Sequence, residues 1–294
     1  MDVVQLVKDG KGIFEYAPVR ISDDRGNMLV EQVFRDGMKF DDLPSMKWNR
    51  KPIAGDDRRW DGVRLGMTGI EMQKICYLLN CMMLTPKEHD HTWDEAGKTG
   101  TRFDMAGMVP GTKWVNGQAV NTGKTITAVA NIHDNHVHLE KAIAKAGGDK
   151  GGHICVVGKY WVLCNALFTR KFATRKDSKG RPLPNIQAIN YGWYSKEAKY
   201  KSVTGIYRVY QDIGGAHPDS HFDPSQLCKL KYRWALLIPK GEEPREVDLY
   251  ELSQDPKWCH LVSHEGPLKT VWLPSTPPPA DDESADYPKP ELVA

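Results

Sequence analysis

Segments of β-type composition occupy the first part of the chain. The stretches "GIFEYAPVRI" and "NMLVEQVF" are rich in β-branched and aromatic residues and are separated by Asp, Gly and Asn, which predicts two strands. Further on, "WDGVRLGM" alternates apolar and polar positions, with Leu65 on one side and Arg64 on the other. This alternation is typical of a strand with one buried face and one exposed face.

The clearest helical pattern follows this strand. Thr68 opens the capping box "TGIE", and apolar residues behind it recur at helical spacing, which predicts a helix over 69–83. Thr85 opens a second capping box, "TPKE", with proline in the first helical position, so a second helix should run to about residue 96. We therefore expect two helices joined by a tight turn.

This helical pair does not fit a DNA-binding helix–turn–helix. A recognition helix needs exposed Arg, Asn or Gln, whereas the second helix carries four acidic residues: Glu88, Asp90, Asp94 and Glu95. The net charge of the chain is only +2, which gives no strong attraction for a polyanion. We expect no nucleic-acid partner.

The second half of the chain is mainly β in pattern. "NIHDNHVHLEKAIAKAGG" predicts a third helix over about 133–146 that ends at paired glycines. "HICVV" and "YWVLCNALF" predict strands joined by a hairpin turn at Gly158 and Lys159; three further strands and a short helix, "VDLYELSQDPKW", follow. The order predicts an α+β fold with a predominantly antiparallel sheet, a helical pair and a third helix inserted before the C-terminal strands.

Four portions follow from these patterns. They are an N-terminal extended or β segment (1–60), a helical portion with a long loop (61–150), an antiparallel β portion with the candidate site (151–273), and a Pro-rich acidic tail (274–294). The tail has too few apolar residues to join a core, which makes it a candidate arm for a protein partner or for self-assembly.

Composition narrows the class of protein. The 294 residues are 40% hydrophobic and 27% charged, which is ordinary for a globular chain, and no apolar run is long enough to span a membrane. The start "MDVVQLVKDGKG" lacks the pattern of a classical signal peptide, so we expect cytoplasmic synthesis, with incorporation into a virion as an open alternative. The six cysteines have no C-x-x-C spacing and lie in apolar runs, which predicts buried reduced thiols.

One polar stretch between two predicted strands, "GGAHPDSHFDPSQ" at 214–226, concentrates chemically active side chains. His217, His221 and Asp223 could converge to bind zinc or another divalent metal with one open position. Without a metal, the same residues could form a His–Asp pair in which the carboxylate orients the base. Ser225 is a nucleophile or, more simply, a turn-capping hydroxyl. The alternative for the whole stretch is a polar turn that begins at His217 with proline second.

Other candidates are weaker. His133, His136 and His138 near the third helix are more typical of a solvated helix terminus than of a ligand set. Lys159 is either a catalytic or anion-binding lysine or a turn residue facing water. His89 and His91 do not share a helix face. The chain contains no P-loop, dinucleotide fingerprint, H-E-x-x-H or kinase signature, which argues against nucleotide-driven chemistry.

Several motifs in order resemble a family of uncharacterised bacterial and phage proteins. They are "VRLGMTGIEMQKICYLLNCMMLTPKEHDHTWDEA", "HICVVGKYWVL", "AINYGW", the 214–226 stretch and "DLYELSQDPKWCHLVSHEGPL". The family has a Gly-x-Lys strand, an IYGW-like strand, a His…Asp-x-Ser loop and a late SDEGP-like segment. The resemblance points to Lys159, His217, Asp223 and Ser225 as site residues. The chain departs from the family pattern at Pro224 and Gln226.

Two functions remain open from the sequence. The first is a hydrolase acting on cell-wall material, with catalytic Lys159, Asp223 and Ser225 or a metal held by His217, His221 and Asp223. The resemblance implies an association with cell envelopes, but no mechanism. The second is a non-enzymatic structural or assembly protein of a phage particle, in which the C-terminal tail engages a partner.

Overall fold

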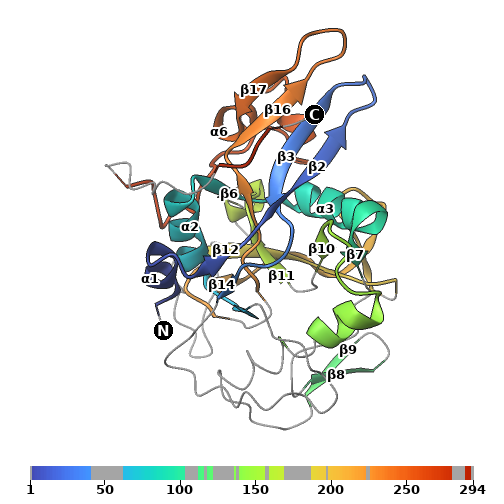
Figure 1. Ribbon diagram of the computed structural model, residues 1–294, viewed down its shortest axis with the longest axis vertical. Coiled ribbons are helices and arrows are strands. Elements are labelled where there is room, and N and C mark those ends of the chain that lie inside the picture. Colours follow the sequence, from blue (N-terminus) through green and yellow to red (C-terminus); the bar gives the residue numbers. More distant parts are fainter. Residues whose placement is uncertain are drawn as a thin grey trace.

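The computed structural model describes eleven parts of the chain: 2–40, 62–102, 112–115, 118–121, 136, 139–155, 159–168, 187–196, 198–222, 226–279 and 289–292. Its elements run in this order (Figure 1): α1 (Val3–Lys8), β1 (Gly12–Ile13), β2 (Tyr16–Ser22), β3 (Met28–Phe34), β4 (Lys39–Phe40), β5 (Val63–Arg64), α2 (Gly69–Leu78), β6 (Cys81–Met83), α3 (Pro86–Thr99), β7 (Thr101–Arg102), β8 (Thr112–Val115), β9 (Gln118–Asn121), β10 (Ile154–Cys155), β11 (Lys159–Val162), η1 (Asn165–Phe168), β12 (Gln187–Tyr194), β13 (Tyr200–Lys201), β14 (Arg208–Pro218), β15 (Leu230–Tyr232), β16 (Trp234–Ile238), β17 (Arg245–Asp248), α6 (Leu249–Leu252) and η2 (Cys259–Leu261).

The largest sheet is antiparallel and is assembled from distant parts of the chain. Its strands run β17-β16-β3-β15-β6, with β2 on the other edge of β3. β2 confirms the first predicted strand and alternates along its length: Ala17, Val19 and Ile21 are buried between more exposed neighbours. β3 is buried at six of its seven positions, because both of its faces are covered: Leu29 and Phe34 belong to one apolar cluster and Val33 to another. The fold is therefore α+β, as the sequence predicts.

A second antiparallel sheet, ordered β11-β12-β14-β13, contains two of the predicted site residues, Lys159 in β11 and His217 in β14. Its central pair, β12 and β14, shows register irregularities on both sides of Asn190. The sequence predicts a hairpin between "HICVV" and "YWVLCNALF" with its turn at Gly158 and Lys159, and this is wrong. β10 pairs in parallel with β7, whereas β11 pairs with β12, so the two segments belong to different sheets.

Both predicted helix starts are confirmed. Thr68 and Thr85 each accept a hydrogen bond from the backbone N–H three residues on, and a glutamate returns the bond in each case. The predicted extent of the first helix is wrong. It ends at Leu78, because Asn80 takes a left-handed conformation (φ 49°), and β6 then separates the two helices. They do not form a helix–turn–helix.

The cap of α3 lies deep in the protein, so its loss should be costly. The Thr85 hydroxyl accepts from the Glu88 N–H at 3.3 Å and also donates to the Val262 carbonyl. We expect Thr85→Ala to destabilise the protein by about 2 kcal/mol, the upper end for a cap, because a buried carbonyl also loses its donor. The half-buried cap Thr68→Ala is the control, at about 1 kcal/mol. Equal losses in urea unfolding would contradict this assignment.

The interior consists of two principal apolar clusters. The larger joins α1, α2, β6 and the residues after β17, and includes Met67, Trp161 and Ala188. The smaller lies on the other face of the second sheet and includes Tyr160, Ile189 and Tyr191. The alternation of β11 and β12 between the two clusters makes this sheet the partition between them. The five described cysteine thiols are buried and free, as predicted: Cys76, Cys81, Cys164, Cys228 and Cys259.

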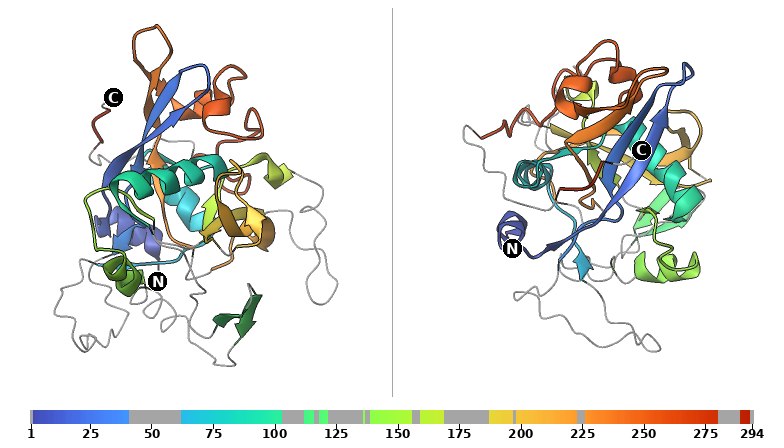
Figure 2. Two further views of the ribbon diagram at one scale, coloured as in Figure 1. Left: turned by 90° about the vertical axis from the view of Figure 1, so that its right-hand side faces the viewer. Right: turned by 45° about the horizontal axis from the view of Figure 1, so that its top comes forward.

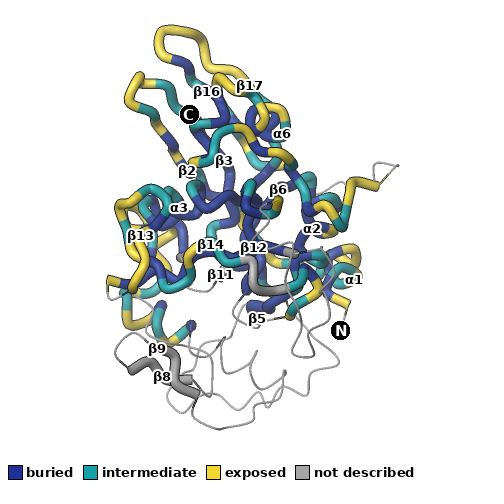
Figure 3. The backbone as a smooth tube through the Cα atoms, turned by 180° about the vertical axis from the view of Figure 1, so that it is seen from behind, coloured by how far each residue is buried: buried dark blue, intermediate teal, exposed yellow. Residues whose placement is uncertain are grey.

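Two hairpins, β2–β3 and β16–β17, project together from the body (Figures 1 and 2), and their tips are exposed while the strand bases are buried (Figure 3). The end of the Pro-rich tail contacts the β2–β3 hairpin, where the Gln32 side-chain amide donates to the Glu291 carbonyl at 3.1 Å. At the other end, the sequence patterns missed α1, which Asp2 caps. No helix in the described part of the chain combines the length and the apolar content needed to cross a bilayer.

Candidate functional site

The stretch 214–226 begins as a strand rather than as a loop. β14 continues to Pro218, and His217 pairs with Ala188 of β12. The turn comes one residue later than predicted, because the His221 N–H donates to the Pro218 carbonyl at 3.0 Å and so makes proline the first residue of the turn. The backbone therefore places His217 before the turn and His221 at its end.

The other predicted site residues are placed only in part. Asp223 and Ser225 lie outside the described residues, and only the backbones of His217 and Lys159 are described. Lys159 is the first residue of β11, opposite Gly192, and not a turn residue. Lys159 and His217 lie on the two strands that flank β12, and because His217 pairs with Ala188, four residues from Gly192, their backbones are also offset by about 13 Å along the strand direction.

Asp219 is the side chain at this turn that sequence reasoning missed. It is 5% exposed, and its Oδ2 atom has no hydrogen-bond partner within the structure as described. The backbone carbonyl of Asp219 accepts from the N–H of Ile70 at 3.2 Å, which holds the turn against the N-terminus of α2. A buried carboxylate oxygen without a donor is costly, so it marks a place where a ligand or water would be stabilised. The sequence signal for Asp219 is its place directly after the proline in "HPDSH".

Two carboxamides near this turn are also buried without partners. Gln226 is 0% exposed and Asn190 is 1% exposed, and neither the nitrogen nor the oxygen of either side chain finds a hydrogen bond among the described residues. Their backbones are linked through Met67 and Trp161. The Met67 N–H donates to the Gln226 carbonyl, and the Met67 carbonyl accepts from the indole of Trp161, which lies opposite Asn190.

The backbone around Asn190 is irregular. The register of β12 against β14 shifts on both sides of Asn190, and Trp193 has a positive φ of 67°. A positive φ is uncommon for a large aromatic residue and costs energy unless the surroundings impose it. Bulges and strained residues are frequent beside active and binding sites, where they redirect side chains. The irregular register of β12 thus occurs at Asn190, one of the two residues whose side-chain amides have no partner in the described chain.

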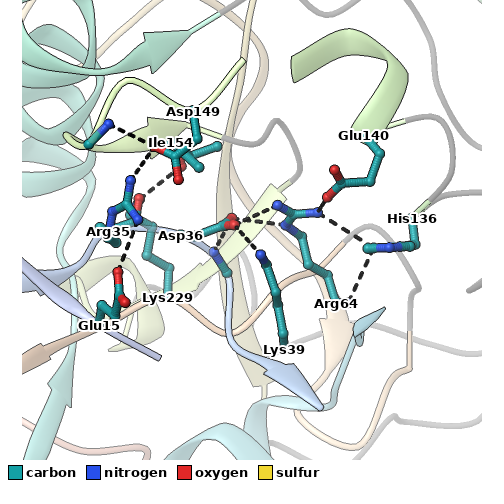
Figure 4. Close-up of polar contacts among 12 residues, drawn as sticks. Glu15, Arg35, Asp36, Lys39, Arg64, His136, Glu140, Asp149, Ile154 and Lys229 are labelled. Carbon is teal, nitrogen blue, oxygen red and sulfur yellow. Dashed lines mark hydrogen bonds and ion pairs between the residues drawn. The ribbon is translucent and has the colours of Figure 1, made fainter. Parts of the chain in front are cut away.

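A second polar group centres on Arg64, which lies between Asp36 and Glu140 (Figure 4). Its guanidinium donates to both Asp36 oxygens, at 2.9 and 2.5 Å, and to Glu140. Burial alone would raise the pKa of Asp36, but the charge and hydrogen bonds of Arg64 hold it below its usual value. The predicted exposed position of Arg64 is wrong, because two carboxylates compensate the buried cation.

His136, one of the three histidines predicted near the third helix, also differs from its prediction, whereas His133 and His138 lie outside the described residues. Of the three, the structure describes only His136, which is buried and has Nδ1 3.5 Å from the Arg64 backbone nitrogen and from one guanidinium nitrogen. It is therefore not a solvated helix terminus. The helix itself is confirmed over 139–145 and ends at Gly147 and Gly148, both of positive φ.

Neighbouring contacts give this polar group a structural role. Arg35 pairs with Glu15 at 2.9 Å and with Asp149, and the Lys229 ammonium donates to the carbonyls of Arg35 and Ile154 at 3.2 and 3.3 Å (Figure 4). These bonds connect segments near β3, β10 and β15. Since each cation has an acceptor or a counter-ion, we interpret them as fold-stabilising contacts, unlike the unpartnered groups around Asp219.

Nothing in the described chain assembles a metal centre: no three His, Cys, Asp or Glu side chains there are grouped to hold an ion. The side chains of His217 and Asp223 lie outside the described part of the chain, so the zinc hypothesis stays a prediction. Comparisons with known proteins add no assignment, because no family model, no curated protein and no solved structure matches the chain.

Proposed function

We propose that the protein is a hydrolase of cell-wall material whose site is formed at the turn after β14. Asp219 carries the proposal: its carboxylate is buried with an oxygen atom that has no partner in the described chain, within a stretch that also holds two histidines. A carboxylate next to an imidazole commonly orients the imidazole as a general base. Functional side chains also concentrate on turns held by a rigid sheet.

The chemistry has two forms. In the metal-free form, His217 or His221 takes a proton from water, and Asp219 or Asp223 orients the imidazole. In the metal form, His217, His221 and Asp223 supply two nitrogens and one oxygen, a set that suits zinc with an open position; the ion would lower the pKa of bound water. Ser225 and Lys159 remain candidate nucleophile and anion-binding residue.

The test is the release of soluble fragments from purified peptidoglycan by the full-length protein. We expect His217→Ala and Asp219→Asn to reduce the rate at least 100-fold, the range for loss of a general base or its orienting group. Asp212→Asn, an exposed carboxylate on the same strand, is the control and should keep the parent rate. Chelation of metal separates the two forms, because only the zinc form should lose activity.

A second candidate is a non-enzymatic component of a phage particle that assembles through the tail. The projecting pair of hairpins favours this candidate, because their exposed tips offer a surface for a neighbouring subunit. The end of the tail lies against β3 of the same pair. A parent protein that releases no fragments and elutes as a large assembly, reduced to monomers by deletion of 275–294, would replace the hydrolase proposal with this one.

A further inference from the structure

The outer face of the β2–β3 hairpin carries a buried strip. In β3, Glu31 directs its side chain to the body of the protein, where it pairs with Lys231, so its neighbours Val30 and Gln32 point to the opposite, outer face. The residues opposite them in the flanking strands are half-buried or exposed, and they are Pro18 and Arg20 of β2 and Leu236 of β16. Val30 and Gln32 are nevertheless only 1% and 4% exposed. Their burial indicates that a further segment of the chain covers this face.

The tail supplies this cover through residues 289–292. The Gln32 side-chain amide donates to the backbone carbonyl of Glu291 at 3.1 Å. Along the segment, Pro290 and Leu292 are half-buried, whereas Lys289 and Glu291 are exposed. The apolar side chains are thus the more covered ones, and the charged ones face water. A backbone carbonyl and two apolar side chains are the parts that an extended peptide offers to a binding surface, so the tail is held as a peptide ligand of the hairpin.

The attachment of the tail allows it to reach a neighbouring molecule as well as its own hairpin. The chain is fixed against α2 as far as Thr276, whose carbonyl accepts from the Tyr77 hydroxyl at 2.6 Å. The three prolines that follow, at 277–279, are exposed, and consecutive prolines make a stiff spacer. Ten residue steps then lead from Pro279 to Lys289, a reach of at most about 33–36 Å. The hairpin itself projects from the body (Figures 1 and 2), so another copy can approach its outer face.

We propose that the outer face of the β2–β3 hairpin is a receptor for the tail of a second copy of this chain, and that the molecule's own tail occupies it in the isolated protein. Two copies carry identical tails, so an exchange between them conserves every contact. The attached tail competes at an effective concentration on the order of millimolar for a short flexible linker. Exchange is therefore favoured at high local protein concentration or where a hairpin lacks its own tail. The inference goes beyond the proposed hydrolysis and does not depend on it.

Two full-length variants with complementary defects test the exchange by sedimentation velocity. Gln32→Glu keeps the tail but places a carboxylate against the Glu291 carbonyl, which disables the hairpin. The tail-replaced variant, with Gly-Ser-Gly-Ser at 289–292, keeps the hairpin but lacks the ligand. Each alone should be monomeric, whereas an equimolar mixture should form a 1:1 dimer at a concentration at least 10-fold below that at which either variant self-associates. Gln5→Glu is the control, because it makes the same charge change on the exposed face of α1, far from the hairpin (Figure 1). Its tail stays on its own hairpin, so its mixture with the tail-replaced variant should associate at least 10-fold more weakly.

A labelled synthetic peptide with the sequence of residues 288–293 gives a second measurement, by fluorescence anisotropy. We expect it to bind the tail-replaced variant and to bind the parent at least 10-fold more weakly, because the parent's own tail competes. A mixture of folded variants that stays monomeric would overturn the inference. So would a peptide that fails to bind the tail-replaced variant, or that binds it and the parent equally, and this result decides the question if Gln32→Glu does not fold. A tail-replaced variant that does not fold would show that the tail is part of the fold and not an exchangeable ligand. Neither measurement involves fragment release, so failure of the hydrolase proposal leaves this one standing.

Discussion

Replacement of Lys231 by methionine is expected to lower the free energy of unfolding by about 3–5 kcal/mol, the range for removal of one partner from a buried ion pair. The ammonium of Lys231 lies 3.3 Å from Glu31 and also contacts Glu88, and all three side chains are 0% exposed. Without the lysine, Glu31 and Glu88 face each other away from water with no cation between them. Urea unfolding at pH 7 measures the loss.

Glu31→Gln is the matched control for this triad. Burial first, and then the charge of Glu88, raise the pKa of Glu31 well above its usual value. A raised folded-state pKa gives a stabilising contribution that is complete at low pH and is lost as pH rises through that value. We therefore expect Glu31→Gln to change stability by less than about 1 kcal/mol while Glu31 is protonated, and to lose less stability than the parent at alkaline pH. A loss as large as that of Lys231→Met would contradict this interpretation.

Acid should destabilise the protein strongly between about pH 6.5 and pH 3, because of buried neutral histidines. Burial first, and then the charge of Lys229, lower the pKa of His153 to about 3, and the same causes lower the pKa of His89. The unfolded chain binds protons on these residues near pH 6.5, so stability is complete above that value and falls as pH decreases. For His153 alone, the loss by pH 3 is on the order of 4 kcal/mol at about 1.4 kcal/mol per pKa unit.

The test is chemical denaturation at several pH values for the parent and for His153→Gln. The glutamine can still donate to the Pro18 carbonyl, which lies 3.1 Å from His153 Nε2, but it cannot be protonated. The variant should therefore lose less stability than the parent between pH 7 and pH 4. Parallel pH curves for the two proteins would show that His153 does not contribute to acid unfolding.

The helix starts could be predicted from the sequence because their interactions are local. Each capping box closes within four residues, so Thr68 and Thr85 carry the signal in the sequence itself. The end of α2 depends on the left-handed conformation of Asn80, which is a weaker sequence signal than a capping box. Apolar residues continue beyond Asn80, so the sequence pattern predicts a longer helix. Local hydrogen bonds were thus predictable, and helix length was less so.

Sheet pairing and buried charge could not be predicted in the same way. The alternation around Arg64 indicates an exposed side chain, yet its compensating carboxylates come from Asp36 and Glu140, which are 28 and 76 residues away. The sequence predicts that "YWVLCNALF" pairs with the nearest apolar run, "HICVV", whereas β11 pairs with β12. For the candidate site, the polar residues of 214–226 can be recognised in the sequence, and their role in function stays a prediction. The unpartnered state of Asp219 and Asn190 follows only from the packing around them.

The position of β3 in the large sheet has a consequence for synthesis of the chain. β3 pairs with β2 through a short turn, but its other edge pairs with β15 and β16, and Glu31 and Lys231 are 200 residues apart. A nascent chain on the ribosome thus carries an open apolar strand edge until β15 and β16, which ends at Ile238, have been made. Such high contact order slows folding, and the open edge favours aggregation. Yield from cells should therefore depend on translation speed and chaperone supply more than the stability of the finished fold implies.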